Sequence, residues 1–414
     1  MFLEKYSMGI GDRFAKEGKA QLKALIKARE AGIDVVPVWN KSYREHKATG
    51  TSPESVRIEA DEAVKALGWD GSYYVDADHI GINNVDMFID SSDFFTIDVA
   101  DYIGQKAQDD EIRAFVDKCT KYAGKLEIPG LDNSFNITKD DIKDIAERFL
   151  LAVKKAGEIY RHIENTRGKD SFITEVSMDE TENPQTPVEM FFILAAISFE
   201  NIPVQNIAPK FTGRFNKGVD YVGDTDQFAL EFESDLAVIA MAVKEFGLYE
   251  NLKLSIHSGS DKFSIYGNIN RLIKKYNAGL HLKTAGTTWL EELIGLALAG
   301  GEGLELAKNI YKKALDRYDE LCAPYAAVIN IDPDTLPSLE TIEKWSGEEY
   351  ANALRHDQEC PEYNLSFRQL LHIAYKVAAD MGEVYINALD KFSYVVGENV
   401  TENIYQRHLI RVFG

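Results

Sequence analysis

The sequence predicts an α/β fold, a (β/α)8 TIM-like barrel, from three observations. Short apolar runs alternate with amphipathic segments of helical period, a pattern typical of parallel βα units. Most of these runs end in polar tips, and such barrels place their chemistry at the carboxyl ends of the strands. The length of 414 residues suits one barrel with insertions. Since no run is followed by GxGxxG or by a GxxxxGK(S/T) loop, we favour the barrel over an open, doubly wound sheet.

Seven βα units follow one another along the chain. The expected strands are residues 7–14, 34–41, 71–81, 171–180, 204–211, 253–257 and 279–286. The expected helices are residues 18–31, 53–67, a segment that begins after Pro187, 224–246, 261–276, a segment through 299, and 304–321. In each helix the apolar residues recur three and four apart, as Leu22, Leu25 and Ile26 do in the first.

The eighth strand is less clear from the pattern. The two candidates are YAAVINID, residues 325–332, and the shorter ALRHD, residues 353–357. A further run, FFTIDVADY at 94–102, could add a strand. Two charged helices are expected near 109–125 and 138–166. We therefore expect a single barrel domain over 1–414, a helical insertion over 98–167 after the third strand, and a C-terminal helical extension over 358–414.

Composition excludes several classes of protein. The formal charge of −21 argues against binding to nucleic acid or to an anionic membrane, which both require a cationic face. An anionic small molecule stays possible, because a few local cations can reverse the field inside one cleft. The three cysteines form no CxxC pair, no run approaches the roughly 18 apolar residues of a membrane span, and the N-terminus shows no signal peptide. The expected location is the cytoplasm.

The polar strand tips hold the candidate functional residues, which a barrel would bring to one mouth. They are the histidines His79, His257, His281 and His356, the carboxylates Asp76, Asp78, Glu175, Asp179 and Glu180, and the cations Arg13, Lys210, Arg214, Lys262 and Lys283. Three histidines at strand tips are a suitable ligand set for a divalent metal with open positions for substrate.

Several roles stay open at this point. Asp78 could act on a substrate or cap a turn, and Glu175 could pair with a lysine or serve as an acid or base. Lys283 could bind a substrate carboxylate, form a Schiff base or neutralise Glu175. The stretch NLSFRQLLHIAYKVA, which contains Arg368 and His372, is expected to be an amphipathic packing helix.

Long ordered blocks of the chain resemble a known family. These blocks are GIGDRF, YYVDADHI, FITEVSMDETENPQTPVE, NIAPKFTGRFNKGVDYVGD, LSIHSGSDKFSIY, LHLKTAGTTWLE and HDQECPEYNLSFRQLLHIAYKVAADMG. Together they resemble the bacterial tagaturonate epimerases over nearly the whole chain. The resemblance implies a metal-dependent interconversion of D-tagaturonate and D-fructuronate in hexuronate breakdown. It also implies His79, His257 and His281 as ligands of a divalent metal (Zn, Mn, Ni, Fe or Co), and Asp78 and Glu175 as the acid/base pair.

The implied reaction predicts a mechanism. The two ketoacids differ at the carbon β to the ketone, whose C–H is not acidic, so simple deprotonation cannot invert it. Retro-aldol cleavage to an enediolate, rotation of the aldehyde and re-addition can, with two carboxylates on opposite sides of the substrate. Lys210, Arg214 or Lys283 would hold the carboxylate of the sugar acid. The alternatives are an aldose–ketose isomerase, a class II aldolase and a sugar-binding protein without catalysis.

Overall fold

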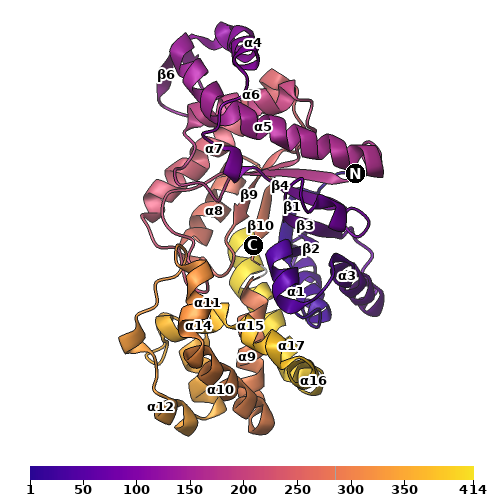
Figure 1. Cartoon of the computed structure of the whole chain (residues 1–414), viewed down its shortest axis with the longest axis vertical. Helices are drawn as coiled ribbons and strands as arrows, with labels where there is room; N and C mark the ends of the chain where they lie inside the picture. The colour runs from indigo at the N-terminus through magenta and orange to yellow at the C-terminus, as the bar shows by residue number, and fades with distance from the viewer. Residues whose placement is uncertain (285) are drawn as a thin grey trace.

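The computed structural model describes residues 1–284 and 286–414 and contains a closed barrel of eight parallel strands (Figure 1). The order around the barrel is β1-β10-β9-β8-β7-β4-β3-β2, and β2 pairs with β1 to close it. The strands are β1 (Tyr6–Ile10), β2 (Val36–Ser42), β3 (Tyr74–Ile80), β4 (Phe94–Asp98), β7 (Ile173–Ser177), β8 (Asn206–Ala208), β9 (Lys253–His257) and β10 (Leu280–Lys283). The predicted (β/α)8 barrel is confirmed.

The position predicted for the eighth strand is wrong. Residue 325 ends η4 (Ala323–Tyr325) and 326–332 are turns and irregular chain, while 353–357 are the end of α13 (Gly347–Leu354) and the irregular chain after it. The eighth strand is β4, which lies between β3 and β7 and within the run 94–102 that could add a strand. Between β3 and β4 the chain forms only the short 3-10 turn η1 (Val85–Met87). Because no full helix precedes β4, the alternation of strands and helices does not predict it. The segment 98–167 therefore follows the fourth barrel strand and not the third.

Helices cover the outside of the barrel. They are α1 (Gly18–Glu30), α2 (Tyr43–Thr49), α3 (Pro53–Leu67), α6 (Pro187–Phe199), α7 (Thr225–Phe246), α8 (Phe263–Lys275) and α9 (Gly286–Ala299). The start of α6 shows how the sequence sets a boundary. The Thr186 side chain accepts from the Glu189 amide while Glu189 accepts from the Thr186 amide, and Pro187 takes the first helical position, where no amide donor is needed.

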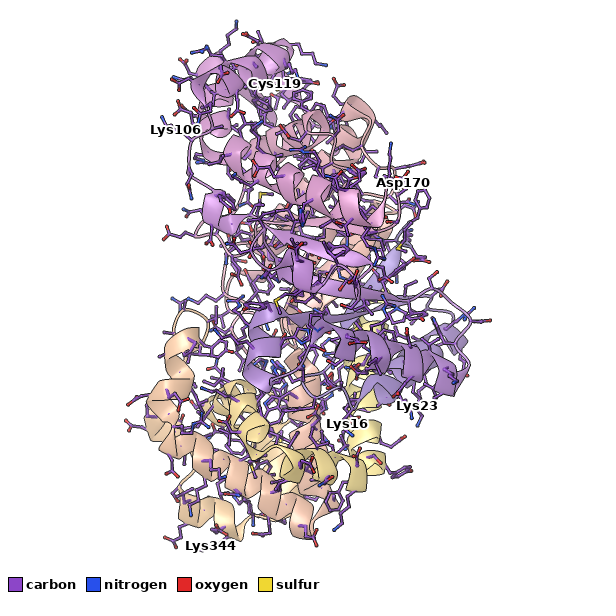
Figure 2. All side chains as sticks on the ribbon, turned by 45° about the vertical axis from the view of Figure 1, so that its right-hand side comes forward. Lys16, Lys23, Lys106, Cys119, Asp170 and Lys344 are labelled. Atoms are coloured by element: carbon purple, nitrogen blue, oxygen red, sulfur yellow. The ribbon has the colours of Figure 1, made fainter. Side chains whose placement is uncertain are left out.

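The segment between β4 and β7 holds α4 (Asp109–Cys119), the antiparallel pair β5 (Gly124–Glu127) and β6 (Ser134–Ile137), and α5 (Lys139–Arg167). The hairpin was not predicted, because its strands have four residues each and little apolar alternation. The long helix α5 packs against α4 and against the barrel helix α6. In Figure 2, Lys106 and Cys119 mark this segment at one end of the molecule, and Lys344 marks the opposite end.

The C-terminal part of the chain is helical. Its elements are α10 (Gly301–Asp316), α11 (Tyr318–Cys322), α12 (Leu339–Lys344), α13, α14 (Leu365–Ile373), α15 (Tyr375–Met381), α16 (Glu383–Lys391), α17 (Ser393–Glu402), the π-helix η6 (Asn403–Leu409) and α18 (Ile410–Phe413). The chain returns to the barrel at its end, since α17 packs on α1 and α9, and α18 packs on α8 (Figure 1). No helix within 1–284 or 286–414 is long and apolar enough to cross a membrane.

The barrel interior changes from apolar to polar along its axis. One inner cluster is apolar and consists of Leu3, Val36, Val38, Tyr74, Phe94 and Ile173. On β10, His281 pairs in register with Ser7 and Ser255, and Lys283, two residues further on, pairs with Gly9 and His257. Because inward-facing residues alternate along a strand, His281 and Lys283 occupy successive inner layers, and Lys283 lies nearer the mouth.

Candidate active site

Lys283 is the centre of a buried charge cluster. Its Nζ lies 2.7 Å from Asp76, 2.9 Å from Asp78 and 3.1 Å from Glu175. Burial alone would lower the pKa of Lys283, but the three carboxylates outweigh burial and raise it well above its usual range. Gly9 makes room for this side chain, because a Cβ there would lie 3.0 Å from Lys283 Cγ. The arrangement favours the neutralising role over a Schiff base, which needs an unprotonated amine.

The carboxylates around Lys283 do not share one environment. Burial raises the pKa of Asp76 to about 7 against the attraction of Lys283. Burial also raises the pKa of Asp78 and of Glu175, but Lys283 and the neighbouring histidines outweigh it and hold both well below their usual values. The Thr96 hydroxyl lies 3.0 Å from Asp76 and 3.2 Å from Glu175 and so links the β3 and β7 carboxylates through β4.

Two of the predicted histidines meet at the mouth. The rings of His79 and His257 are 5.0 Å apart, and Asp179 lies between them. Asp179 is 3.5 Å from His79 Nε2 and 3.2 Å from His257 Nδ1. His79 has a positive φ of 54° where the register between β3 and β4 shifts, an uncommon conformation for a residue with a side chain. Such local strain is found most often at functional sites.

Asp78 and Glu175 orient these two imidazoles. Asp78 lies 3.0 Å from His79 Nδ1, and Glu175 lies 2.8 Å from His257 Nε2. The other nitrogen of each ring, His79 Nε2 and His257 Nδ1, faces Asp179. Burial lowers the pKa of His257, but Asp179 and Glu175 outweigh burial and raise it to about 9.

This group fits a divalent metal. One ligand atom each from His79, Asp179 and His257 can be chosen so that all three lie within 4.8 Å of one another. His257 Nδ1 is buried and makes no hydrogen bond to the described part of the chain. Two histidines and one carboxylate, with a second carboxylate behind each histidine, are a common ligand arrangement for first-row transition metals.

The structure does not bring His281 to this group. It lies one layer deeper, with Nδ1 2.9 Å from the Ser7 hydroxyl and its ring 5.2 Å from Phe94. Its Nε2 is buried and has no hydrogen-bond partner within the described residues. Burial lowers the pKa of His281 to about 3. His356 is also elsewhere, 3.3 Å from Asp261 at the interface with the C-terminal helices.

The side chains of two of the predicted substrate-binding cations make no hydrogen bond or ion pair with the described residues of the cluster. Arg214 is exposed, and its backbone forms a bridge with Val222. Lys210 is half-buried, and its amide donates to Gln185. Neither side chain makes a hydrogen bond or ion pair with any described residue. The third, Lys283, is surrounded by carboxylates of the protein itself.

Two residues of the site were missed as such by sequence reasoning. Asp179 was recognised as a tip carboxylate but not as a companion of the histidines; its position two residues beyond β7 was the available signal. Thr96 could not be found, because β4 itself was not expected as one of the eight strands.

We call His79, Asp179 and His257 the metal-suited group. This group and the carboxylates around Lys283 lie together at the mouth of a closed parallel barrel. The arrangement defines the class of protein as a barrel enzyme equipped for proton transfer on a small polar substrate. The family model described as tagaturonate epimerase matches residues 1–409, and the chain belongs to this family of isomerases. A protein of Thermotoga maritima named tagaturonate/fructuronate epimerase is 27% identical over 421 residues, which cover 97% of this chain and 80% of that protein.

Solved structures share the fold. The glycerol-complexed fructuronate-tagaturonate epimerase of Cohnella laeviribosi superposes with a TM-score of 0.80 at 24% identity, and its native form with 0.78 at 24% identity. Both matches cover 100% of this chain and 82% of the other.

Proposed function

We propose that this enzyme interconverts D-tagaturonate and D-fructuronate and that it depends on a divalent metal. Membership of the tagaturonate epimerase family and the name of the Thermotoga maritima relative support the substrate pair. The observation that carries the metal dependence is the meeting of His79, Asp179 and His257 beside Asp78 and Glu175.

His79, Asp179 and His257 would hold the metal, and Zn, Mn, Ni, Fe and Co all suit this donor set. When bound, the metal would act as a Lewis acid toward charge that develops on the ketone side of the substrate. Asp78 and Glu175 would keep the two imidazoles in the tautomer that turns His79 Nε2 and His257 Nδ1 inward.

Inversion of the carbon β to the ketone would proceed by retro-aldol cleavage. A carboxylate takes the proton of the β-hydroxyl, the bond between the α and β carbons breaks, and its electron pair stays on the α carbon as an enediolate. The β carbon becomes an aldehyde, rotates, and is attacked on its other face. The returned proton completes the epimer, so atoms and electrons balance without an external oxidant.

Asp78 and Glu175 are the proposed acid/base pair. The expectation that they flank the substrate from opposite sides is wrong in its geometry, because β3 and β7 are separated only by β4 and both carboxylates contact Lys283 Nζ. This common contact supports a different division of labour. A proton taken by one carboxylate can be returned from the other, while Lys283 keeps both acids ionised before the reaction.

Elemental analysis of the purified protein, combined with an NMR assay of D-tagaturonate, tests the proposal. We expect bound transition metal, formation of D-fructuronate, loss of turnover with chelator and recovery on adding metal. Turnover that survives complete removal of metal would refute the metal dependence. In D2O no deuterium should enter the inverted carbon, since a C–C bond and not a C–H bond is broken there; deuterium at that carbon would refute the retro-aldol route.

A further inference from the structure

Beside the metal-suited group, the loops that follow β9 and β10 pack tightly against each other. Gly259 comes two residues after His257, and Gly286 comes three residues after Lys283. A Cβ on Gly286 would collide with the carbonyl oxygen of Gly259, so the two backbones meet without side chains between them. The surroundings of this contact are consequently tied to the strand ends that carry the site.

Two cationic side chains flank the contact between Gly259 and Gly286. Arg13, from the loop after β1, lies with Nη1 3.5 Å from the Gly286 carbonyl oxygen. Lys217, from the loop after β8, lies with Nζ 3.6 Å from the position of a Cβ on Gly259. Its backbone is anchored by a bond from the Lys217 amide to the Val328 carbonyl.

These cations are incompletely paired by the protein. Lys217 Nζ has no hydrogen bond or ion pair with any described residue, although the residue is half-buried. Arg13 is 6% exposed; among the described residues its Nε is buried without a hydrogen-bond partner, and its ion pair is with Glu45 at 3.4 Å. Arg13 is further held by the ring of Tyr375, 4.4 Å from its guanidinium carbon. Unpaired buried donors are costly unless a ligand satisfies them.

A third polar group faces the same place. His372 on α14 is 3% exposed, and its Nε2 is buried, unpartnered among the described residues, and 3.0 Å from the position of a Cβ on Gly286. The helix α9 begins at Gly286, so the positive end of its dipole adds to the field there. In a chain of net charge −21, this is a local surplus of positive charge and donors.

We propose that Arg13 and Lys217, with His372 beside them, bind the carboxylate of the sugar acid substrate. The inference rests on the proposed function, from which it takes the substrate class. It replaces Lys210 and Arg214, whose side chains make no contact with the described residues of the cluster, and Lys283, whose donors are already used by Asp76, Asp78 and Glu175. A guanidinium is well matched to a carboxylate, and a lysine adds a second, mobile donor.

The position of the carboxylate on the substrate implies a second function for the subsite formed by Arg13 and Lys217. Retro-aldol cleavage divides the six-carbon acid into two three-carbon fragments, and the carboxylate stays on the aldehyde fragment. That fragment must rotate before the bond re-forms, and it must not leave. Binding by Arg13 and Lys217 would retain it at one end while the aldehyde end turns.

The variant Lys217→Met tests the inference, with Lys217→Arg as the charge-preserving variant. Lys312→Met is the matched control, because Lys312 is exposed on α10, far along the chain from any residue of the site. We expect Lys217→Met to lower kcat/KM for D-tagaturonate about 10- to 100-fold, the usual scale for a charged hydrogen bond, mainly through KM. We also expect release of three-carbon fragments to rise relative to epimer formation.

Binding of D-tagaturonate to chelator-treated protein, measured by calorimetry, separates this subsite from catalysis. Wild type and Lys217→Arg should bind more tightly than Lys217→Met, and the neutral ketohexose D-tagatose should bind all three equally. Unchanged uronate binding and unchanged fragment release in a folded Lys217→Met protein would overturn the inference while leaving the epimerase function intact. Absence of epimerisation by wild type would instead refute the proposed function.

Discussion

At the scale of single residues, the site is built from shared contacts. Lys283 forms ion pairs with three carboxylates, and two of these carboxylates also form hydrogen bonds with histidines. Each such residue therefore acts on more than one neighbour, and a substitution is expected to show several effects at once. Measurements that report metal content and turnover separately are needed to divide them.

The proposed metal ligands give the first prediction. His257→Ala and Asp179→Asn should each lose most bound metal while the fold survives. Both side chains face the point where the ligand atoms of His79, Asp179 and His257 come together. His281→Asn should keep its metal, since His281 lies in the deeper layer against Ser7. Metal content by mass spectrometry, with circular dichroism as the folding control, decides the matter. The opposite pattern, metal lost with His281 and kept with Asp179, would make His281 the ligand.

The proposed acid/base pair, Asp78 and Glu175, gives the second prediction. Asp78→Asn and Glu175→Gln should each cut turnover at least about a hundredfold at saturating metal, the scale of a positioned acid or base. Each should also weaken metal affinity about 10- to 100-fold, because the amide holds its histidine less firmly. Rates measured across a metal titration separate the two effects. Full recovery of turnover at high metal would show that the carboxylates only position His79 and His257.

At the scale of elements, the connection from β1 to α1 couples folding to pH. Asp12 accepts hydrogen bonds from the amides of residues 14–17, and Glu17 lies next to it, 4% exposed. Burial, together with the charges of Asp12 and Asp390, raises the pKa of Glu17 to about 8. The folded state thus keeps a proton on Glu17 that the unfolded state releases near its ordinary pKa of about 4.3.

The third prediction follows from this difference. With the folded pKa raised, the stabilising contribution is full below the unfolded pKa and is lost as pH rises through about 8. Glu17→Gln, which stays neutral, should therefore leave stability at pH 4 nearly unchanged and raise it at pH 9. The gain is roughly 1.4 kcal/mol for each pKa unit of the shift. Urea unfolding at both pH values measures it, and an equal effect of the substitution at pH 4 and pH 9 would contradict the pKa assignment.

Sequence patterns predicted most elements of this fold, because a parallel barrel repeats one signal. Of the seven predicted ranges, five contain their strand in full, β1 begins one residue before its range, at Tyr6, and β2 ends one residue after its range, at Ser42. The remaining strand, β4, lies within the run 94–102, which the pattern predicts as a possible strand but not as one of the βα units, since no full helix precedes it. β1 ends at Ile10, short of the predicted boundary at 14, because Gly11 turns with φ 137° and lies against the Asn40 carbonyl.

The site was predictable in its residue types more than in its geometry. The strand tips marked His79, His257, Asp78, Glu175 and Lys283 correctly as neighbours. They could not separate His281 from the other histidines, since layer depth depends on register between strands and not on position along one strand. For the same reason Asp179, beyond the end of β7, could not be assigned to the histidines before the loops were placed.

At the scale of the whole molecule, one buried carboxylate connects the C-terminal helices to the barrel through polar contacts. Asp261, in the loop after β9, lies 2.8 Å from Arg368 Nη2, 3.0 Å from His408 Nε2 and 3.3 Å from His356 Nδ1. These partners come from α14, from the π-helix η6 and from the loop after α13. The loop that follows the metal-suited His257 is therefore held by the far end of the chain.

Arg368 gives the last prediction. It is fully buried and also donates to the Gly218 and Leu354 carbonyls, so it joins the loop after β8, the loop after β9 and the C-terminal helices. Arg368→Met removes the positive charge and leaves Asp261 with the Thr287 hydroxyl and the two histidines, one of which, His356, has its pKa lowered by burial. Loss of one partner of a buried pair costs about 3–5 kcal/mol, and we expect a destabilisation of that order in urea unfolding. Adding Asp261→Asn to Arg368→Met should recover part of the loss, because the stranded charge is removed. If Arg368→Met unfolds at the same urea concentration as wild type, the C-terminal helices are held by apolar packing alone and Asp261 is not their fastening point.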